Sequence, residues 1–251
     1  MVKQTLTIPS RIDDIEIDIG IPENWDEQKL MILHHGFNSG KRGGTYTTIG
    51  DKLYESGIAY AKFSLPYHAE RRHDDYDFTL ANCIEDCELV EKAIREKFPQ
   101  TQIGIIGRSF GGYLSLLRFK KFHHPYFTII LLSPAIRMAE IFQNALAGEH
   151  FEEFKEQGYG VFQNAPDNMI IHYALYQELE NNKVSNLGTF EETIHIYHGN
   201  LDNTAPFADS EEFAKNNPHT TLTTLENEKH AYTPEGLTHL CEEMIRLIKN
   251  S

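Results

Sequence analysis

The chain has 251 residues, 40% of them hydrophobic, and 37 acidic against 23 basic residues give it a formal net charge of −14. A chain of this size can bury a core of its own, and its negative charge repels nucleic-acid phosphates and anionic lipid surfaces. It lacks the roughly 18 consecutive apolar residues of a membrane span and the apolar core of a signal peptide at its N-terminus. We therefore expect a cytoplasmic protein that binds neither nucleic acid nor membranes.

Eight short β-rich segments are spread along the chain. The first two, near residues 5 and 14, alternate apolar and polar side chains, which is typical of antiparallel strands with one exposed face. Those near residues 29, 102 and 127 contain the apolar runs LMIL, IGII and TIILL, which indicate strands buried on both faces. The other three begin near residues 57, 193 and 220.

Helical patterns separate the later strands. Apolar residues recur every three or four positions over 80–98 and again over 237–248, behind Thr233 and Pro234, which form a cap followed by a first-turn proline. Regular alternation of strand and helix predicts a mostly parallel sheet with helices on both faces. Such sheets bind ligands beyond the carboxyl ends of their strands.

Two features are interpreted as structural. The three cysteines, Cys83, Cys87 and Cys241, are spaced neither for zinc nor for a disulfide framework, so we expect buried, small apolar side chains. The charged stretch ERRHDDYD at 70–77 is expected to be a solvated loop.

A serine lies in the glycine-rich stretch GRSFGG, between the buried strand IGII and a helical run. Gly107 and Gly111 flank Ser109, because a side chain at either place would collide with the neighbouring strand or helix. The turn holds the serine among the unpaired N–H groups of a helix N-terminus, which suit a developing oxyanion. Its position between strand and helix predicts a nucleophile. The alternative is a plain glycine-rich turn.

A nucleophilic serine needs a histidine base and a carboxylate that orients it, in the chain order Ser, Asp, His. Asp202 follows the strand segment near residue 193, and His230 lies between the last strand and the last helix. Taken singly, Asp202 could be only a turn former, and His230 could be any one of the thirteen histidines. Together they complete the required order. Asp209 and His239, within predicted helices, and Glu226, at the strand end before His230, are weaker candidates.

The stretch HHGFNSG, residues 34–40, directly follows the buried strand LMIL. Its His-Gly pair lets the backbone turn close to the nucleophile, so the N–H groups of Phe37 and Phe110 are the predicted oxyanion donors. We interpret the two histidine side chains as structural hydrogen-bonding groups. A metal site that adds His195 and His198 has no recognised ligand spacing to support it.

Together these motifs resemble the α/β-hydrolase family over nearly the whole chain. The residues HGF at 35–37 match the family's oxyanion loop, GRSFGG at 107–112 its nucleophile elbow, HGNLD at 198–202 its acid loop and His230 its histidine loop. The HGF loop, the chain length and an insertion after the sixth core strand are similar to small bacterial esterases that include feruloyl and cinnamoyl esterases.

The resemblance implies an α/β fold with an eight-stranded, mostly parallel sheet, a triad of Ser109, His230 and Asp202, and no cofactor. Two residues depart from the family pattern. Lys229 precedes the histidine, where a small residue or glycine is common, and Arg108 precedes the serine, where histidine is frequent. Both leave the catalytic atoms in place and bear on the subfamily, and so on the substrate.

Residues 137–190 form a longer connection than one crossover helix needs. We expect a small, mostly helical lid inserted into a core of residues 1–136 and 191–251. The candidate substrate-pocket residues are Phe142, Phe162 and Tyr173. The alternative is that the aromatic side chains only hold the lid together.

These expectations combine into a serine esterase that transfers an acyl group in two steps, acting on small acyl or aryl esters, including hydroxycinnamoyl-like ones. A small-molecule ester is the expected partner, neither metal nor cofactor is expected, and a homodimer is left open. An amidase or peptidase would use the same parts, and a non-catalytic ligand-binding protein would keep the fold, so both alternatives stay open.

Overall fold

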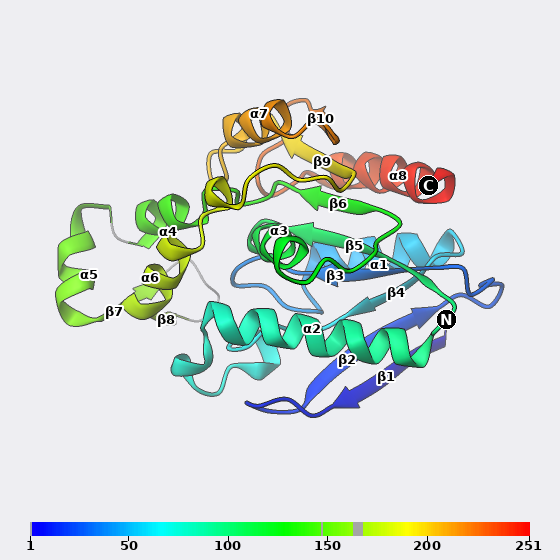
Figure 1. Cartoon of the computed structure of the whole chain (residues 1–251), viewed down its shortest axis with the longest axis horizontal. Coiled ribbons are helices and arrows are strands. Elements are labelled where there is room, and N and C mark those ends of the chain that lie inside the picture. Colours follow the sequence, from blue (N-terminus) through cyan, green and yellow to red (C-terminus); the bar gives the residue numbers. More distant parts are fainter. Residues whose placement is uncertain (1, 147, 163–167) are drawn as a thin grey trace.

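The computed structural model describes residues 2–146, 148–162 and 168–251. Its main feature is an eight-stranded sheet with the strand order β1-β2-β4-β3-β5-β6-β9-β10 (Figure 1). The strands are β1 (Val2–Ile8), β2 (Ile15–Ile21), β3 (Lys29–His34), β4 (Ala59–Lys62), β5 (Gln102–Arg108), β6 (Ile129–Leu132), β9 (Ile194–Gly199) and β10 (Thr220–Leu225). Strand β2 pairs antiparallel with β1 and β4, whereas the other neighbours pair in parallel. The predicted mostly parallel sheet with an antiparallel edge is confirmed.

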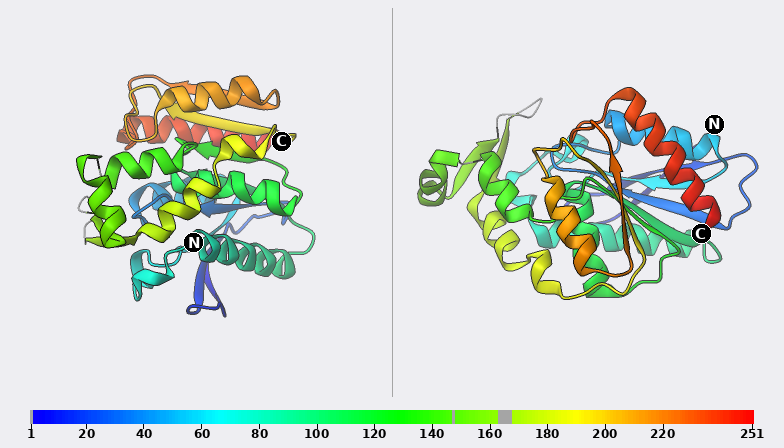
Figure 2. Two further views of the ribbon diagram at one scale, coloured as in Figure 1. Left: turned by 60° about the vertical axis from the view of Figure 1, so that its left-hand side comes forward. Right: turned by 90° about the horizontal axis from the view of Figure 1, so that it is seen from above.

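Helices cover both faces of this sheet. The core helices are α1 (Gly44–Glu55), α2 (Leu80–Lys97), α3 (Phe110–Phe122), α7 (Phe207–Asn216) and α8 (Pro234–Asn250). Seen from above, α7 and α8 lie on opposite sides of the sheet (Figure 2). The predicted cap of α8 is present, because the Thr233 hydroxyl accepts a hydrogen bond from Gly236 N at 3.0 Å and Pro234 occupies the first turn.

The two faces are filled by alternate residues of the same strands. In β3, Leu30 and Ile32 belong to the apolar cluster of α2 and α3, whereas Met31 and Leu33 belong to that of α1 and α8. This alternation follows from the two-residue period of a strand, and the unbroken run LMIL is what burial on both faces requires.

The three cysteines are buried parts of this core, as expected. Burial raises the pKa of the Cys87 thiol to about 12 and that of Cys241 to about 11, so both carry their protons at neutral pH.

The lid segment, which we define as residues 137–190, lies at the end of the molecule toward which the parallel strands point (Figure 1). It contains α4 (Met138–Leu146), η3 (Gly148–His150), α5 (Phe151–Gln157), β7 (Tyr159–Phe162), β8 (Met169–His172), α6 (Tyr173–Asn181) and η4 (Val184–Leu187). The expected helices are present, but β7 and β8 also pair as a small antiparallel sheet. Their short stretches lack the longer alternation that would have marked them as strands.

The lid segment contacts the core beside the loop that follows β4. The ring of His172, at the end of β8, stacks on Tyr76 with centroids 4.0 Å apart, and its Nε2 atom lies 3.1 Å from Asp75 Oδ1. Both partners belong to the short helix η2 (Asp75–Asp77). On the other side, the Tyr113 hydroxyl of α3 donates to Asn182 O at 2.9 Å.

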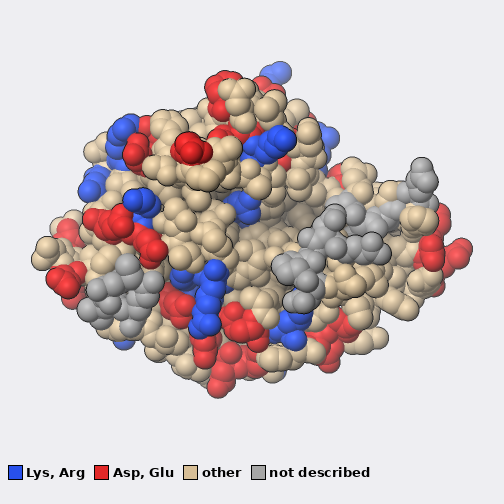
Figure 3. Space-filling view, turned by 180° about the vertical axis from the view of Figure 1, so that it is seen from behind, with Lys and Arg blue, Asp and Glu red and all other residues tan. Residues whose placement is uncertain are grey.

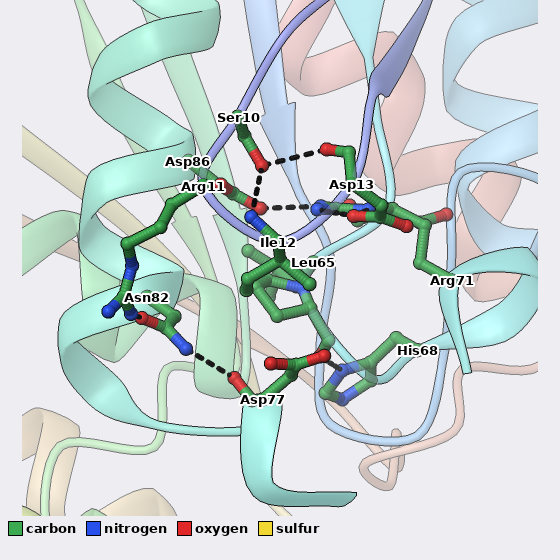
Figure 4. Close-up of polar contacts among 12 residues, drawn as sticks. Ser10, Arg11, Ile12, Asp13, Leu65, His68, Arg71, Asp77, Asn82 and Asp86 are labelled. Atoms are coloured by element: carbon green, nitrogen blue, oxygen red, sulfur yellow. Dashed lines mark hydrogen bonds and ion pairs between the residues drawn. The ribbon is translucent and has the colours of Figure 1, made fainter. Parts of the chain in front are cut away.

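The charged stretch 70–77 is not simply a solvated loop, which corrects the expectation above. Arg71, in η1 (Ala69–Arg71), is only 5% exposed. Its guanidinium lies between the carboxylates of Asp13 and Asp86 (Figure 4). It also donates to Ser64 O at 2.9 Å. The β1–β2 turn, the loop after β4 and helix α2 are thereby joined at one cation. The sequence pattern missed this because the two carboxylates are distant in the chain.

Charged side chains of both signs are interspersed over the face shown in Figure 3, which is hollowed near its middle where the visible surface is mostly uncharged. Among the residues that the structure describes, none of the helices combines the length and apolar character needed to cross a membrane.

Candidate active site

Ser109 occupies a strained turn between β5 and α3. Its backbone has φ +51° and ψ −117°, a conformation that residues other than glycine rarely adopt. A Cβ on Gly111 would lie 2.1 Å from His34 O, and one on Gly107 would lie 2.7 Å from Ser115 Oγ. The expected collisions with the neighbouring strand and helix are therefore confirmed, and they explain why glycine flanks the serine.

The structure brings Ser109, His230 and Asp202 together from three separate loops. His230 Nε2 lies 3.1 Å from Ser109 Oγ, and His230 Nδ1 lies 2.7 Å from Asp202 Oδ2. Because a carboxylate accepts hydrogen bonds only, Nδ1 carries the proton in the neutral ring. Nε2 is then free to accept the proton of the serine hydroxyl.

Asp202 is 4% exposed and lies in the loop after β9. Its Oδ1 atom accepts from Thr204 N at 2.8 Å and Ala205 N at 3.0 Å, and its Oδ2 atom also lies 3.1 Å from His198 Nε2. Burial alone would raise the pKa of this carboxyl, but the hydrogen bonds from His198 and His230 hold it well below its usual range. Asp202 is therefore an anion at neutral pH.

The loop that carries His230 is held at both ends. Before the histidine, Glu228 accepts from Thr233 N at 2.8 Å and from the Thr233 hydroxyl at 2.5 Å, next to the N-terminus of α8. At the histidine itself, Arg108 Nη2 donates to His230 O at 2.6 Å, and the guanidinium lies over the Tyr232 ring at 5.7 Å. The arginine that departs from the family pattern thus fixes the backbone of the base.

The loop after β3 passes beside the nucleophile. A Cβ on Gly36 would lie 3.2 Å from Ser109 Cβ, which puts the next N–H group, that of Phe37, in the vicinity of the serine. No backbone hydrogen bond among the described residues uses this N–H group. Phe110 is the first residue of α3, and the N–H groups of a first helical turn lack partners within the helix.

The two histidines before Gly36 have structural roles, as interpreted from the sequence. His34 Nδ1 bonds the Ser115 hydroxyl at 2.9 Å, and His35 Nε2 accepts from Leu65 N at 2.8 Å. Burial lowers the pKa of His35 to about 4 and that of His34 well below its ordinary value, so both rings are neutral.

Aromatic rings surround the loop that carries Phe37. Its ring contacts that of Phe162 with centroids 4.9 Å apart and that of Phe142 at 6.0 Å, so the lid segment meets the core here. Tyr173 instead contacts the rings of three lid residues: Phe151, Phe154 and Tyr176. Its contacts fit the alternative in which the aromatic side chains hold the lid together.

This geometry agrees with comparisons of the chain with known proteins. The model of the prolyl oligopeptidase family matches residues 76–249, a stretch that includes Ser109, Asp202 and His230. The chain belongs to the prolyl oligopeptidase family. No curated protein matches the sequence.

Solved structures show the same fold. Est1E from Butyrivibrio proteoclasticus, in a structure with ferulic acid bound, has a TM-score of 0.83 at 21% identity, with 98% of each chain covered. Mouse α/β hydrolase domain-containing protein 10 has a TM-score of 0.77 at 16% identity, with 100% of this chain and 99% of that chain covered. The esterase domain of a Rhodothermus marinus protein has a TM-score of 0.73 at 15% identity over the same shares. The chain therefore has the α/β-hydrolase fold, as the sequence motifs implied.

The weaker candidates for the acid and base of this prolyl oligopeptidase family member lie elsewhere. Asp209 pairs with Arg137 at 3.3 Å, and Glu226 accepts from Asn200 Nδ2 at 2.6 Å. His239 lies within α8. Ser109 and its two partners are left as the group with the geometry for nucleophilic catalysis.

A cavity of about 400 Å³ lies between the lid segment and the core but away from Ser109. It is lined by α4, η4 and α7, and none of the three triad candidates contributes to its wall. Ion pairs in this wall join Arg137 to Asp209 at 3.3 Å and to Glu212, and Lys183 to Glu140 at 3.4 Å. We do not assign the acyl pocket to this cavity.

Three residues of the described chain could together offer a metal ion its ligands: Glu88, Glu91 and His124. The Arg118 guanidinium already donates to both carboxylates, so a cation occupies that position. The four histidines considered from the sequence form no such group among the described residues; His195 bonds Thr221 and His198 bonds Ser210 instead.

Sequence reasoning missed the supporting residues of the site. The one indication for Glu228 was its position, two residues before His230 and five before the cap Thr233. Carboxylates are common near the start of a helix, so this position alone does not predict a supporting role. In the sequence, Arg108 stood out only as a departure from the family pattern. His198 stood out as the first residue of the HGNLD motif and as one of four histidines without metal-ligand spacing. The roles of Arg108 and His198 depend on contacts between loops that are distant in the chain.

Proposed function

We propose that the protein hydrolyses carboxylic esters through Ser109, His230 and Asp202. The observation that carries this proposal is the continuous series of contacts from Ser109 Oγ to His230 Nε2 at 3.1 Å and from His230 Nδ1 to Asp202 Oδ2 at 2.7 Å. A hydroxyl, an imidazole and an ionised carboxylate in this order activate a serine toward a carbonyl carbon.

The reaction proceeds in two steps. His230 takes the proton of Ser109 as the serine oxygen attacks the ester carbonyl, and it then gives that proton to the leaving alcohol. The N–H groups of Phe37 and Phe110 stabilise the oxyanion, and Asp202 stabilises the imidazolium. Water repeats the sequence on the acyl-enzyme, with His230 again as the base, and releases the acid.

The substrate class is proposed as small acyl or aryl esters, including hydroxycinnamoyl-like ones. The rings of Phe142 and Phe162 beside Phe37 support an aromatic acyl group, because apolar rings gain from contacts with further rings. The ferulic acid bound in the structure of Est1E, a protein of the same fold, also supports this class.

The first prediction concerns the nucleophile. A fluorophosphonate probe should label the protein at Ser109, and Ser109→Ala should lose hydrolysis of nitrophenyl acetate by a factor on the order of 10³ or more while still folding. Mass spectrometry of the labelled peptide and steady-state rates measure the two effects. Ser133→Ala, which removes a hydroxyl that bonds Tyr232 rather than His230, is the matched control. Labelling at a different serine would contradict the assignment.

Peptide hydrolysis is the second candidate, because the matching family is named for an oligopeptidase. The same residues can protonate an amine leaving group, so ester and peptide hydrolysis would use the same catalytic residues. The two activities are distinguished by their relative rates. A panel of aryl esters, esters of increasing acyl length and peptide nitroanilides compares them directly. A protein that is labelled by no fluorophosphonate and turns over none of these would be a ligand-binding protein instead.

A further inference from the structure

A second histidine lies against the carboxylate of the proposed triad. His198, near the end of β9, has no exposed surface. Its Nε2 atom lies 3.1 Å from Asp202 Oδ2 and 2.9 Å from Ala205 O, and its Nδ1 atom lies 2.8 Å from Ser210 Oγ in α7. The ring thus joins the acid loop to the helix that follows it.

The neighbours of His198 determine where its proton lies. Both groups near Nε2, a carboxylate and a backbone carbonyl, can only accept hydrogen bonds, so Nε2 carries a proton. In the neutral ring Nδ1 must then accept, and the Ser210 hydroxyl donates to it. His198 is therefore a buried donor whose Nε2–H group is shared between Ala205 O and Asp202 Oδ2.

This donor completes the environment of the carboxylate. An ionised carboxylate has about four acceptor positions. Thr204 N and Ala205 N occupy two on Oδ1, and His230 Nδ1 and His198 Nε2 occupy two on Oδ2. Without His198, His230 itself would be the one remaining partner of this oxygen within the described part of the chain.

We propose that His198 is a positioning residue that holds Asp202 Oδ2 toward His230, so that it acts on the reaction through Asp202. The inference rests on the proposed function, since it assigns His198 to the same site. A histidine that served only to pack β9 against α7 would affect folding but would not depend on the Asp202 carboxylate. The two roles therefore predict different behaviour when Asp202 is absent.

The variants separate the donor from the ring. His198→Phe keeps an aromatic ring without a donor and should lower kcat by about 10- to 100-fold, the range for a lost hydrogen bond to a charged group, with KM little changed. His198→Gln keeps an N–H donor near the Nε2 position and should recover most of that loss. His195→Phe, the same change on the same strand at a residue bonded to Thr221, is the matched control and should keep the wild-type rate.

The deciding measurement repeats His198→Phe in an Asp202→Ala background. If His198 acts through Asp202, the second substitution should cause no further loss of kcat, because the group it positions is gone. An equal loss in both backgrounds, or a wild-type rate for His198→Phe, would overturn the proposal. If His198→Phe does not fold, Ser210→Ala replaces it in the same pair of backgrounds. This variant removes the hydrogen bond to His198 Nδ1 but keeps the imidazole ring.

Each variant is also assayed by the rate at which a fluorophosphonate labels Ser109. This rate depends on activation of the serine and needs no ester substrate. Normal labelling of the wild type without hydrolysis of any ester would contradict the proposed function, while slower labelling of His198→Phe would still support the positioning role. Equal labelling of wild type and His198→Phe would overturn that role, whatever the substrate.

Discussion

At the scale of single residues, the site depends on one anion and the tautomer that it selects. Asp202 accepts the Nδ1 proton of His230 at 2.7 Å, which leaves Nε2 as the base toward Ser109. An asparagine at this position could donate its amide proton to Nδ1, and the proton would then move to the wrong nitrogen. The proposed mechanism therefore needs the carboxylate both for its charge and for its inability to donate.

The second prediction follows from this tautomer. Asp202→Asn should lower kcat by about 10⁴-fold with little change in folding, because the imidazole then presents a proton to Ser109. Because hydrogen bonding keeps the pKa of Asp202 well below its usual range, the wild-type kcat/KM should show no titration of Asp202 between mildly acid and neutral pH. Initial rates from acid to neutral pH measure both effects. A near-normal rate for Asp202→Asn would contradict the role proposed for Asp202, and EDTA should change neither the wild-type rate nor that of the variant.

At the scale of elements, we expect the core and the lid segment to have separate tasks. Ser109, Asp202 and His230 are carried by loops of the core sheet, whereas Phe142 and Phe162 come from α4 and β7 of the lid segment. Their rings meet that of Phe37 beside the nucleophile. Discrimination among esters should therefore depend on the lid segment more than the chemical step does.

The third prediction tests this division. Phe142→Ala and Phe162→Ala should reduce kcat/KM for bulky aryl esters more than for nitrophenyl acetate, by about 1 to 3 kcal/mol for the ring that lines the site. Tyr173→Ala is the control, because Tyr173 packs against Phe154 and Tyr176 within the lid and should affect both esters alike. If all three variants lost activity equally on small and large esters, the lid rings would serve packing alone.

At the scale of the whole molecule, the interior holds neutral histidines that acid should charge. His34, His35 and His68 are each 1% exposed. Burial lowers the pKa of His35 to about 4 and that of His68 to about 3. Unfolding exposes these rings to water, where they bind protons below about pH 6.5. Stability is thus complete above that pH and falls as the pH drops toward the folded-state values, by about 1.4 kcal/mol per pH unit for each ring.

The fourth prediction isolates one of these rings. His68→Phe should reduce the difference in the free energy of unfolding between pH 7 and pH 5 by about 2 kcal/mol, because phenylalanine binds no proton in either state. His68 Nε2 has no hydrogen-bond partner within the described structure, so the change loses only the bond from Nδ1 to Pro66 O. Urea denaturation at the two pH values measures it. His219→Phe, at a half-exposed surface position, should leave the difference unchanged.

The sequence by itself determined the sheet, its antiparallel edge and the helices on both faces, because strand and helix periods are local properties of the chain. It also picked out Ser109, Asp202 and His230 in their order, since each follows a strand whose end the pattern locates.

Only the tertiary structure decided which groups support these three residues. The Arg108 contact with His230 O and the place of His198 against Asp202 arise where separate loops converge. The same holds for Arg71 between two distant carboxylates and for Tyr173 within the lid. Hydrogen bonds and ring contacts between distant segments leave no period in a sequence, so only the folded chain defines them.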